Sequence, residues 1–373
     1  MPRWLNRVAD RVADHLGGAV DAVDAALDRP SSHSDPPWHM PDEGDPHTRT
    51  WMAFGASKKI WGSRLLPLVQ RNLVSIAAAI AQFEPVTLLV RPEDVGTAQA
   101  LLAATNAAGV TLHPIALDDL WVRDYGCVFV RRGPEVAGVD FNFNGWGEKQ
   151  SCGRDGAVAA AMCKAASVAH LTTDLTLEGG GIEVDGRGTA IVTESCVLNR
   201  NRNPKWTRAD VEEELAFLLG IRKVIWLPGI KGKDITDGHT DFYARFASPG
   251  VVVAALDNDP ESFDYKVTRT HLDILRHATD AAGQRLHVVT LAAPETVRPQ
   301  WRHDDEFSAG YINFYACNGA VVVPQFGDPK ADEAARSTLQ QLFPTRRVVQ
   351  VEIDGLAAGG GGIHCATQQE IAR

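Results

Sequence analysis

Four short segments of the sequence place an ionisable side chain beside glycine or in a polar context. They are residues 121–126 (WVRDYG), 178–182 (EGGGI), 237–241 (DGHTD) and 359–365 (GGGGIHC). Together they carry a thiol, an imidazole and several carboxylates, a set that serves nucleophilic and acid–base catalysis. Each group also occurs in ordinary surface turns, so the chemistry depends on whether the fold brings the segments together.

Cys365 is preceded closely by four successive glycines, residues 359–362. Glycine loses much backbone freedom on folding, so such a run is costly unless the backbone turns tightly or lies close to a ligand. We therefore expect the Cys365 thiol at the rim of a pocket, where a neighbouring cation or protonated histidine lowers its pKa and makes it nucleophilic. The alternative is a flexible loop with an incidental buried cysteine.

His239 and Asp241 lie two residues apart. If this segment is extended, both side chains project from the same face. A histidine and a carboxylate on one face form a proton shuttle and a cation anchor. The alternative is a surface pair without a function.

Asp124 and Glu178 add two more carboxylates. A guanidinium group is planar with a rigid fork of N–H donors, which bidentate carboxylates match well. A site of Asp124, Glu178 and Asp241 would hold a guanidinium group, with a thiol beneath the central carbon of that group. The same set suggests a cysteine hydrolase of another kind or a metal site, although too few soft ligands cluster for a metal.

The elements that must position these residues alternate between helical and β-rich segments from Trp38 onward. Predicted helix-to-strand pairs are 71–83 with 86–90, 207–219 with 223–227, 259–282 with 286–291 and 332–342 with 348–353. Predicted hairpins pair 127–130 with 136–143 and 311–315 with 320–323. The recurrence predicts one α/β unit repeated within a single domain over residues 38–373, and it leaves the number of units open.

Composition narrows the class of protein. Hydrophobic residues make up 45% of the 373, and the formal net charge is −10, which favours encounter with small cations over nucleic acid or anionic membranes. The six cysteines lack CxxC spacing, which predicts reduced thiols in a cytoplasmic protein. No apolar run approaches the roughly 20 residues of a membrane span.

Residues 1–37 precede this body. Apolar residues from Trp4 to Leu27 recur at helical spacing, and 29–37 form a Pro- and Ser-rich linker. Charges at Asp10, Arg11 and Asp14 argue against a signal peptide. We expect an amphipathic helix that packs on its own domain or, alternatively, docks a partner or joins copies of the chain.

In this order the four segments resemble those of the agmatine deiminase and Porphyromonas-type peptidylarginine deiminase family. Further matching strings are residues 193–204 (TESCVLNRNRNP), 313–315 (NFY), 323–328 (VPQFGD) and 363–369 (IHCATQQ). The resemblance covers roughly residues 38–373. It implies a pentein-type fold, a pseudo-symmetric α/β propeller of five ββαβ modules, and it implies no cofactor.

Carried over by motif, the resemblance implies roles for individual residues. Cys365 is the nucleophile, His239 the general acid and base, and Asp124 and Asp241 grip the guanidinium, with Glu178 as a further carboxylate. Trp121 matches an aromatic residue of the substrate channel, and Asp237 is a further candidate for substrate binding.

The implied reaction is hydrolysis of agmatine to N-carbamoylputrescine and ammonia through a covalent thiouronium intermediate. Departures from the family pattern at Ile235, Phe242, Gly310 and Ala366 leave open arginine, peptidyl-arginine or another guanidine as substrate. A guanidine-binding or scaffold protein is the alternative from another class. The family often forms homo-oligomers, so one is expected here.

Overall fold

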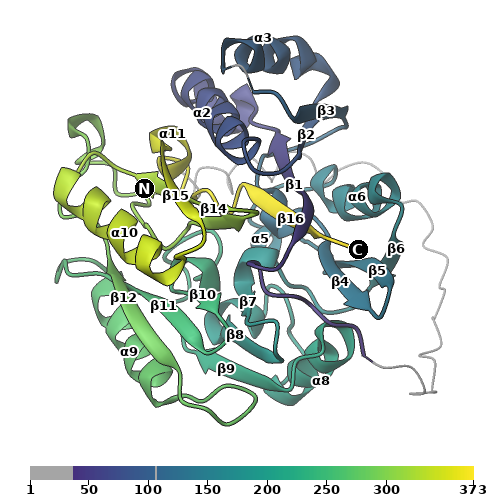
Figure 1. The fold of residues 1–373 in the computed structure, drawn as a ribbon, viewed down its shortest axis with the longest axis vertical. Helices are drawn as coiled ribbons and strands as arrows, with labels where there is room; N and C mark the ends of the chain where they lie inside the picture. Colours follow the sequence, from purple (N-terminus) through teal and green to yellow (C-terminus); the bar gives the residue numbers. More distant parts are fainter. Residues whose placement is uncertain (1–36, 106) are drawn as a thin grey trace.

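Five small sheets follow one another along the chain (Figure 1). The computed structural model describes residues 37–105 and 107–373, so the predicted N-terminal helix and most of its linker lie outside the described residues. Each sheet contains an antiparallel strand pair, followed by a helix and a strand that returns parallel to the second strand of the pair. This ββαβ unit is the repeat that the sequence predicts.

The elements group into five modules. Module 1 contains β16 (Thr367–Ile371), β1 (His47–Phe54), α2 (Lys58–Ile80), β2 (Val86–Val90), η2 (Pro92–Asp94), α3 (Val95–Thr105) and β3 (Val110–Pro114). Module 2 contains α4 (Val122–Tyr125), β4 (Val128–Arg132), β5 (Glu135–Asp140), α5 (Gly145–Glu148), η3 (Asp155–Ala157), α6 (Val158–Ala166) and β6 (Ala169–Thr172). Module 3 contains η4 (Gly179–Gly181), β7 (Ile182–Val184), β8 (Thr189–Thr193), α7 (Glu194–Val197), α8 (Arg208–Leu219) and β9 (Lys223–Leu227).

The last two modules follow the same plan. Module 4 contains η5 (Thr240–Phe242), β10 (Ala244–Ser248), β11 (Val251–Leu256), α9 (Asp264–His277) and β12 (His287–Ala292). Module 5 contains η6 (Pro299–Trp301), β13 (Tyr315–Cys317), β14 (Ala320–Gln325), α10 (Pro329–Leu342), β15 (Arg347–Glu352) and α11 (Asp354–Ala357).

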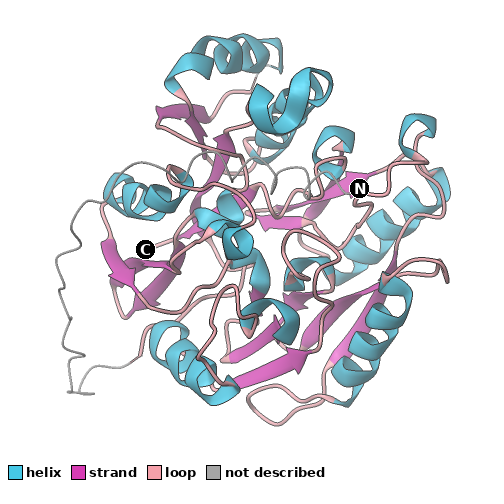
Figure 2. Cartoon of the chain, turned by 180° about the vertical axis from the view of Figure 1, so that it is seen from behind, coloured by secondary structure: helices cyan, strands magenta, loops and turns pink. Residues whose placement is uncertain are grey.

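The modules surround a common centre, with the long helices at the periphery (Figures 1 and 2). The ring closes in module 1, where β16 from the end of the described chain pairs antiparallel with β1 from its beginning. Trp51 of β1 lies opposite Gln368 of β16. The predicted fold of five ββαβ modules around a pseudo-fivefold axis is confirmed.

Local sequence explains where the helices begin. Thr207 and Asp210 form the predicted capping box of α8, each side chain accepting from the backbone N–H of the other. Asp328 caps α10 by accepting from the N–H of Ala331, with Pro329 at the first helical position. Strand β9 has the predicted bounds.

Three predicted elements were wrong in extent. Helix α2 begins at Lys58 because it continues through a kink at Gly62 (φ +64°) and through Pro67, residues that read as breakers in the sequence. Helix α9 is shorter than residues 259–282, since Asp259 and the following Pro260 belong to a loop. The predicted strand 311–315 is a loop as far as Phe314, and β13 begins at Tyr315.

The hydrophobic core is shared between modules. One cluster of buried side chains joins modules 1, 2, 4 and 5, a second joins modules 2 and 3, and a third joins modules 3 and 4. Each module therefore completes the core of its neighbours. Within the described residues, no helix is both long and apolar enough to span a membrane.

Candidate active site

The five modules each contribute a polar residue from an equivalent place, the short segment just before the first strand of the antiparallel pair. These residues are Asp124 before β4, Glu178 before β7, Asp241 before β10, Asn313 before β13 and Cys365 before β16. Those segments meet at the centre of the ring, so the fold converts five positions far apart in sequence into one buried cluster.

The Cys365 thiol is buried in this cluster, with 6% of the residue exposed. Its Sγ lies 3.4 Å from Asp241 Oδ2 and accepts from Asn313 Nδ2 at 3.3 Å. Burial and the charges of Asp241 and Asp124 raise the pKa of this thiol well above its ordinary value. The expected rim position with a pKa-lowering cation was therefore wrong, because the nearest charges are carboxylates.

Asp241 has one free carboxylate oxygen. Its Oδ2 accepts from His364 Nδ1 at 2.7 Å, in addition to its contact with the thiol. Its Oδ1 is buried and has no hydrogen-bond partner in the structure. Burial favours the protonated form, but the hydrogen bond and charge of His364 lower the pKa of Asp241 below its ordinary value. An ionised oxygen without a partner is costly to bury, so a cationic ligand is the group it suits.

His239 lies between two carboxylates. Its Nε2 is 3.2 Å from Glu178 Oε2 and its Nδ1 is 3.7 Å from Asp124 Oδ1. Burial alone lowers the pKa of His239, but the Asp124 charge and hydrogen bonds with Cys196 and Glu178 raise it well above its ordinary value. The two carboxylates therefore favour the protonated imidazole, the form that can donate a proton.

Gly180 leaves room at the point where these side chains converge. A Cβ on this residue would lie 2.7 Å from His239 Nδ1, 2.8 Å from Asp124 Oδ1 and 3.1 Å from Asp241 Oδ2. The segment from His239 to Asp241 does not meet the condition of being extended, because residues 240–242 form the 3-10 turn η5. Both side chains face the same space nonetheless.

Glu178 and Asp237 are linked through Arg202. Arg202 Nε donates to both Glu178 oxygens at 2.8 and 3.0 Å, and its Nη1 donates to Asp237 Oδ2 at 3.0 Å. Arg202 and His239 hold the pKa of Glu178 at about 2 although burial alone would raise it. Asp237 also accepts from Lys149 Nζ at 2.7 Å and from the N–H of Gly232 at 2.9 Å. Both of its oxygens therefore bind the protein itself, and it stands behind Arg202 rather than beside the thiol.

Trp121 packs on the glycine run that precedes Cys365. A Cβ on Gly361 would lie 2.4 Å from the Trp121 ring, and one on Gly362 would lie 2.3 Å from Asn313 Oδ1. The run therefore consists of glycine because the backbone must approach these side chains closely.

The family model of Porphyromonas-type peptidyl-arginine deiminase matches residues 39–370. The chain belongs to this family. It is 39% identical over 362 residues to the agmatine deiminase of Ectopseudomonas mendocina, with 90% of this chain and 96% of that protein covered. It is 38% identical over 362 residues to the agmatine deiminase of Pseudomonas fluorescens, with the same coverage.

A solved structure gives the same fold. The agmatine deiminase of Enterococcus faecalis is 32% identical and superposes with a TM-score of 0.80, with 89% of this chain and 95% of that chain covered. The fold assignment of this deiminase family member thus has support from both sequence and structure.

Several residues in or beside the buried cluster were not among the site residues predicted from the sequence. Asn313 and His364 contact Cys365 and Asp241, and Arg202 holds Glu178. Asn313, His364 and Arg202 stand within the strings that carried the resemblance, which was the available signal. Spacing alone gave no reason to select them.

Glu178, Cys196 and His239 offer ligand atoms that all lie within 4.8 Å of one another, the one such group among residues 37–105 and 107–373. A soft divalent cation could use these donors. However, the Arg202 guanidinium already binds both Glu178 oxygens and would repel a second cation. The donor set therefore fits a metal poorly.

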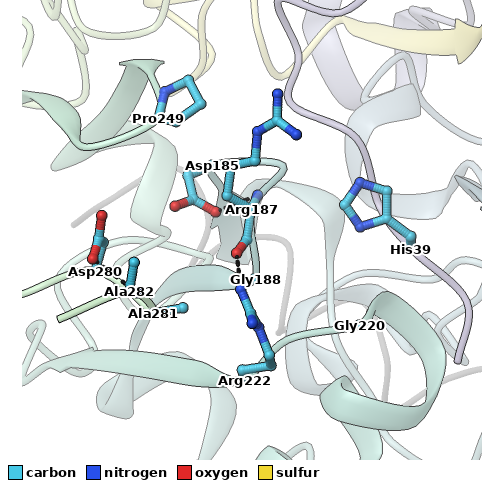
Figure 3. Close-up of a pocket in the computed structure, with 10 residues that line it drawn as sticks. All are labelled: His39, Asp185, Arg187, Gly188, Gly220, Arg222, Pro249, Asp280, Ala281 and Ala282. Carbon is cyan, nitrogen blue, oxygen red and sulfur yellow. Dashed lines mark hydrogen bonds between the residues drawn. The ribbon is translucent and has the colours of Figure 1, made fainter. Parts of the chain in front are cut away.

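A separate surface pocket of about 520 Å³ lies between modules 3 and 4 (Figure 3). Among its lining residues, Arg222 Nη2 donates to the backbone oxygen of Arg187 at 2.7 Å. His39, Asp185 and Asp280 also line it, and none of the candidate catalytic residues does.

Proposed function

We propose that this chain hydrolyses the guanidinium group of agmatine, giving N-carbamoylputrescine and ammonia, with Cys365 as nucleophile. The observation that carries the proposal is the unpartnered Asp241 Oδ1 in the cluster that holds the Cys365 thiol. A buried carboxylate oxygen beside a buried thiol suits a cation whose central carbon is to be attacked. The names of the relatives, which are agmatine deiminases, select agmatine among guanidines.

Binding would use the carboxylates. Asp241 Oδ1 and the Asp124 carboxylate would each accept hydrogen bonds from the N–H groups of the guanidinium. Such charge-assisted hydrogen bonds are strong and directional. Glu178 would not bind the guanidinium directly, since its carboxylate oxygens already contact Arg202 and His239. Trp121 would line the approach to the thiol.

In the first chemical step, the Cys365 thiolate attacks the guanidinium carbon. The C–S bond forms as the π electrons of the guanidinium move onto nitrogen, giving a tetrahedral adduct. The adduct collapses with cleavage of one C–N bond, while protonated His239 donates a proton to the departing nitrogen. Ammonia leaves, and the alkyl-thiouronium remains on Cys365.

In the second step, a water molecule attacks the same carbon while neutral His239 takes one of its protons. The C–S bond then breaks, the sulfur leaves as thiolate, and the hydroxyl group of the adduct releases its proton to solvent as its oxygen becomes the ureido carbonyl. The net change is addition of water and loss of ammonia. No redox step occurs.

The thiol must lose its proton before it attacks. Because carboxylates surround Cys365, the free site disfavours the thiolate. A bound guanidinium would offset this charge and lower the pKa of Cys365, so deprotonation is coupled to substrate binding. A thiol pKa that is unchanged by a bound guanidinium analogue would contradict this step.

The test is turnover by the purified protein of agmatine, arginine, a peptidyl-arginine and simple alkylguanidines, with ammonia and ureido product both measured. Agmatine should be turned over fastest, and Cys365→Ser should reduce kcat by at least about 10³-fold. Cys317→Ser, at a buried cysteine outside the cluster, is the matched control and should retain activity. Faster turnover of another guanidine would move the specificity, and silence across the panel would refute the proposal.

We further propose a cytoplasmic location, division of the chain into a segment of residues 1–37 and one catalytic domain over 38–373, and assembly into a homo-oligomer. All six cysteines are free thiols, which suits a reducing compartment. The apolar periodicity of the N-terminal segment supports a role in docking a partner or a second copy. Light scattering and pull-downs with and without residues 1–36 test this role.

A further inference from the structure

A left-handed turn stands beside the candidate site. Residues 145–148 of α5 all have positive φ, with Trp146 at +56° and Glu148 at +62°. The i to i+4 hydrogen bonds from the N–H of Glu148 to Asn144 and of Lys149 to Gly145, both 3.0 Å, close the turn. Left-handed α conformation is unfavourable for non-glycine residues and normally occurs at single residues.

Strain of this kind is concentrated around the site. The described chain has five non-glycine residues with positive φ. Three of them, Asn142, Trp146 and Glu148, lie in or near the turn, and a fourth, Asp237, accepts a hydrogen bond from Lys149 directly after it. Such conformations persist only where the surrounding structure imposes them, and they cluster at functional sites. The turn therefore needs an explanation beyond chain connection.

The surroundings hold the turn firmly. Asn144 Oδ1 accepts from the N–H of Gly147 at 2.7 Å, and Asn144 Nδ2 donates to the backbone oxygen of Asn201 at 2.9 Å. A Cβ on Gly147 would lie 2.2 Å from the Asn201 side chain. Lys149 Nζ, directly after the turn, is 2.7 Å from Asp237 Oδ2. The turn is thus fixed to the strand connections of module 3.

The turn directs a buried indole at Asp124, a carboxylate that we propose binds the substrate. Trp146 is 2% exposed, its ring packs edge-on against Phe143 at 5.1 Å, and its Nε1 donates to Asp124 Oδ2 at 2.9 Å. The N–H of Gly180 donates to Asp124 Oδ1 at 3.1 Å. Each oxygen of Asp124 is therefore held by one protein donor, which fixes the plane of the carboxylate.

We infer that Trp146 is a positioning residue for substrate binding, and that the left-handed turn at 145–148 exists to place its indole N–H on Asp124. The inference rests on the proposed function. A carboxylate free to rotate would pay an entropic cost each time it met a guanidinium, whereas one fixed in advance does not. The strained turn lowers the stability of the free protein, and the fixed orientation of the Asp124 carboxylate is what it provides.

The test is Trp146→Phe, which keeps an aromatic ring and removes the N–H donor. The KM for agmatine should rise about tenfold or more, the expected loss for a hydrogen bond to a charged group, with kcat falling much less. The acidic limb of kcat/KM should also move to higher pH, because the carboxylate loses a bond that favours its ionised form. A merely structural role would lower kcat and stability without moving that limb.

Two further variants sharpen the test. Trp226→Phe is the matched control. The Trp226 indole lies outside the cluster and donates to Glu212 Oε1 at 2.7 Å, so the KM of this variant for agmatine should not change. Gly147→Ala keeps the indole but disturbs the turn, so it should raise KM in the same way. Its effect should not add to that of Trp146→Phe, because both act through one contact. Gly147→Ala also serves if Trp146→Phe lowers the melting temperature.

Binding separates this inference from the proposed function. Calorimetric titration of agmatine into Cys365→Ala protein should give weaker binding when Trp146→Phe is added. Absence of turnover by the unaltered protein would refute the proposed function. Equal affinities with and without Trp146→Phe would refute the positioning role alone.

Discussion

At the scale of single residues, Asp124 is the carboxylate of the candidate site whose pKa lies closest to the physiological range. Burial, together with the charges of Asp241 and Glu178, raises its pKa to about 6, although His239 and Trp146 act in the opposite direction. Its carboxylate is thus less favourable in the folded protein than in the unfolded chain. As pH rises from the ordinary value of 3.8 to about 6, this group lowers the free energy of unfolding.

We therefore expect kcat/KM for agmatine to fall by roughly tenfold per pH unit below about pH 6, as Asp124 takes up a proton and loses its attraction for the cation. A pH–rate profile at saturating and limiting agmatine measures this limb. Its position should belong to the free protein, so it should appear in kcat/KM more clearly than in kcat. A limb near pH 4 would show that Asp124 is not the group concerned.

Some residues of the site could be predicted from the sequence, and others could not. Cys365, His239 and the carboxylates became candidates because their segments place ionisable side chains beside glycine or in a polar context. Asn313 and His364 were missed because an amide and a second histidine are unremarkable until the fold places them on the thiol and on Asp241. Asp237 was a candidate for substrate binding, but its side chain binds Arg202 and Lys149 instead.

At the scale of elements, the short turns before each hairpin determine the site. Glycines 179–181 form η4, which contacts both α4 and η5, the turns that carry Asp124 and Asp241. Because these turns are irregular, hydrophobic periodicity predicted the strands and helices around them but not the turns themselves. The capping box of α8 was predictable from local chemistry, whereas the continuation of α2 through Gly62 depends on packing that local patterns do not contain.

Gly180→Ala should abolish substrate binding while the protein stays folded. The added methyl would lie within 3.1 Å of His239, Asp124 and Asp241, so it would occupy the space of the guanidinium. We expect kcat/KM for agmatine to fall by at least about 10²-fold, equivalent to the loss of one or two charge-assisted hydrogen bonds. Steady-state kinetics and the far-UV circular dichroism spectrum measure the two effects.

Gly96→Ala is the matched control for this change. Gly96 lies in α3, and a Cβ there would meet no atom within 4 Å. Alanine in a helix is favoured over glycine by about 0.5–1 kcal/mol, so this variant should be as active as the parent and slightly more stable. An active Gly180→Ala protein would show that substrate binds elsewhere.

At the scale of the whole molecule, Glu43 joins the modules from their centre. Its Oε1 accepts from Arg245 Nη2 at 2.7 Å and from the N–H of Ala316 at 2.9 Å. Its Oε2 is 3.1 Å from Arg123 Nη2 and 2.9 Å from His364 Nε2. These partners belong to modules 4, 5, 2 and 1. A residue that precedes β1 therefore ties the ring together and supports, through His364, the carboxylate beside the thiol.

Glu43→Gln should destabilise the protein by about 3–5 kcal/mol, because two buried guanidinium groups would lose a carboxylate partner. Thermal or urea unfolding measures the change, and activity should fall as His364 loses its partner. Glu333→Gln is the control, since Glu333 pairs with Arg336 on the exposed face of α10 and its loss should leave the melting temperature unchanged. Equal stability of both variants would contradict a central role for Glu43.

A chain beginning at Pro37 should fold and keep kcat/KM for agmatine within about twofold, because Glu43 and every candidate site residue lie beyond this point. Activity assays and light scattering on the shortened and full chains test this expectation. A change in mass without a change in activity would assign residues 1–36 to assembly. Loss of activity would instead show that the catalytic domain needs them.

The pairing of β16 with β1 has a consequence for how the protein is made. The ribosome synthesises β1 long before β16, and domains begin to fold as they emerge. Until residues 367–371 arrive, β1 presents an open edge whose natural partner does not yet exist, a template for association with other nascent chains. The same late segment brings the thiol of Cys365. Chains that have not reached these residues therefore lack both the nucleophile and the partner strand of β1, and synthesis of residues 365–371 supplies both.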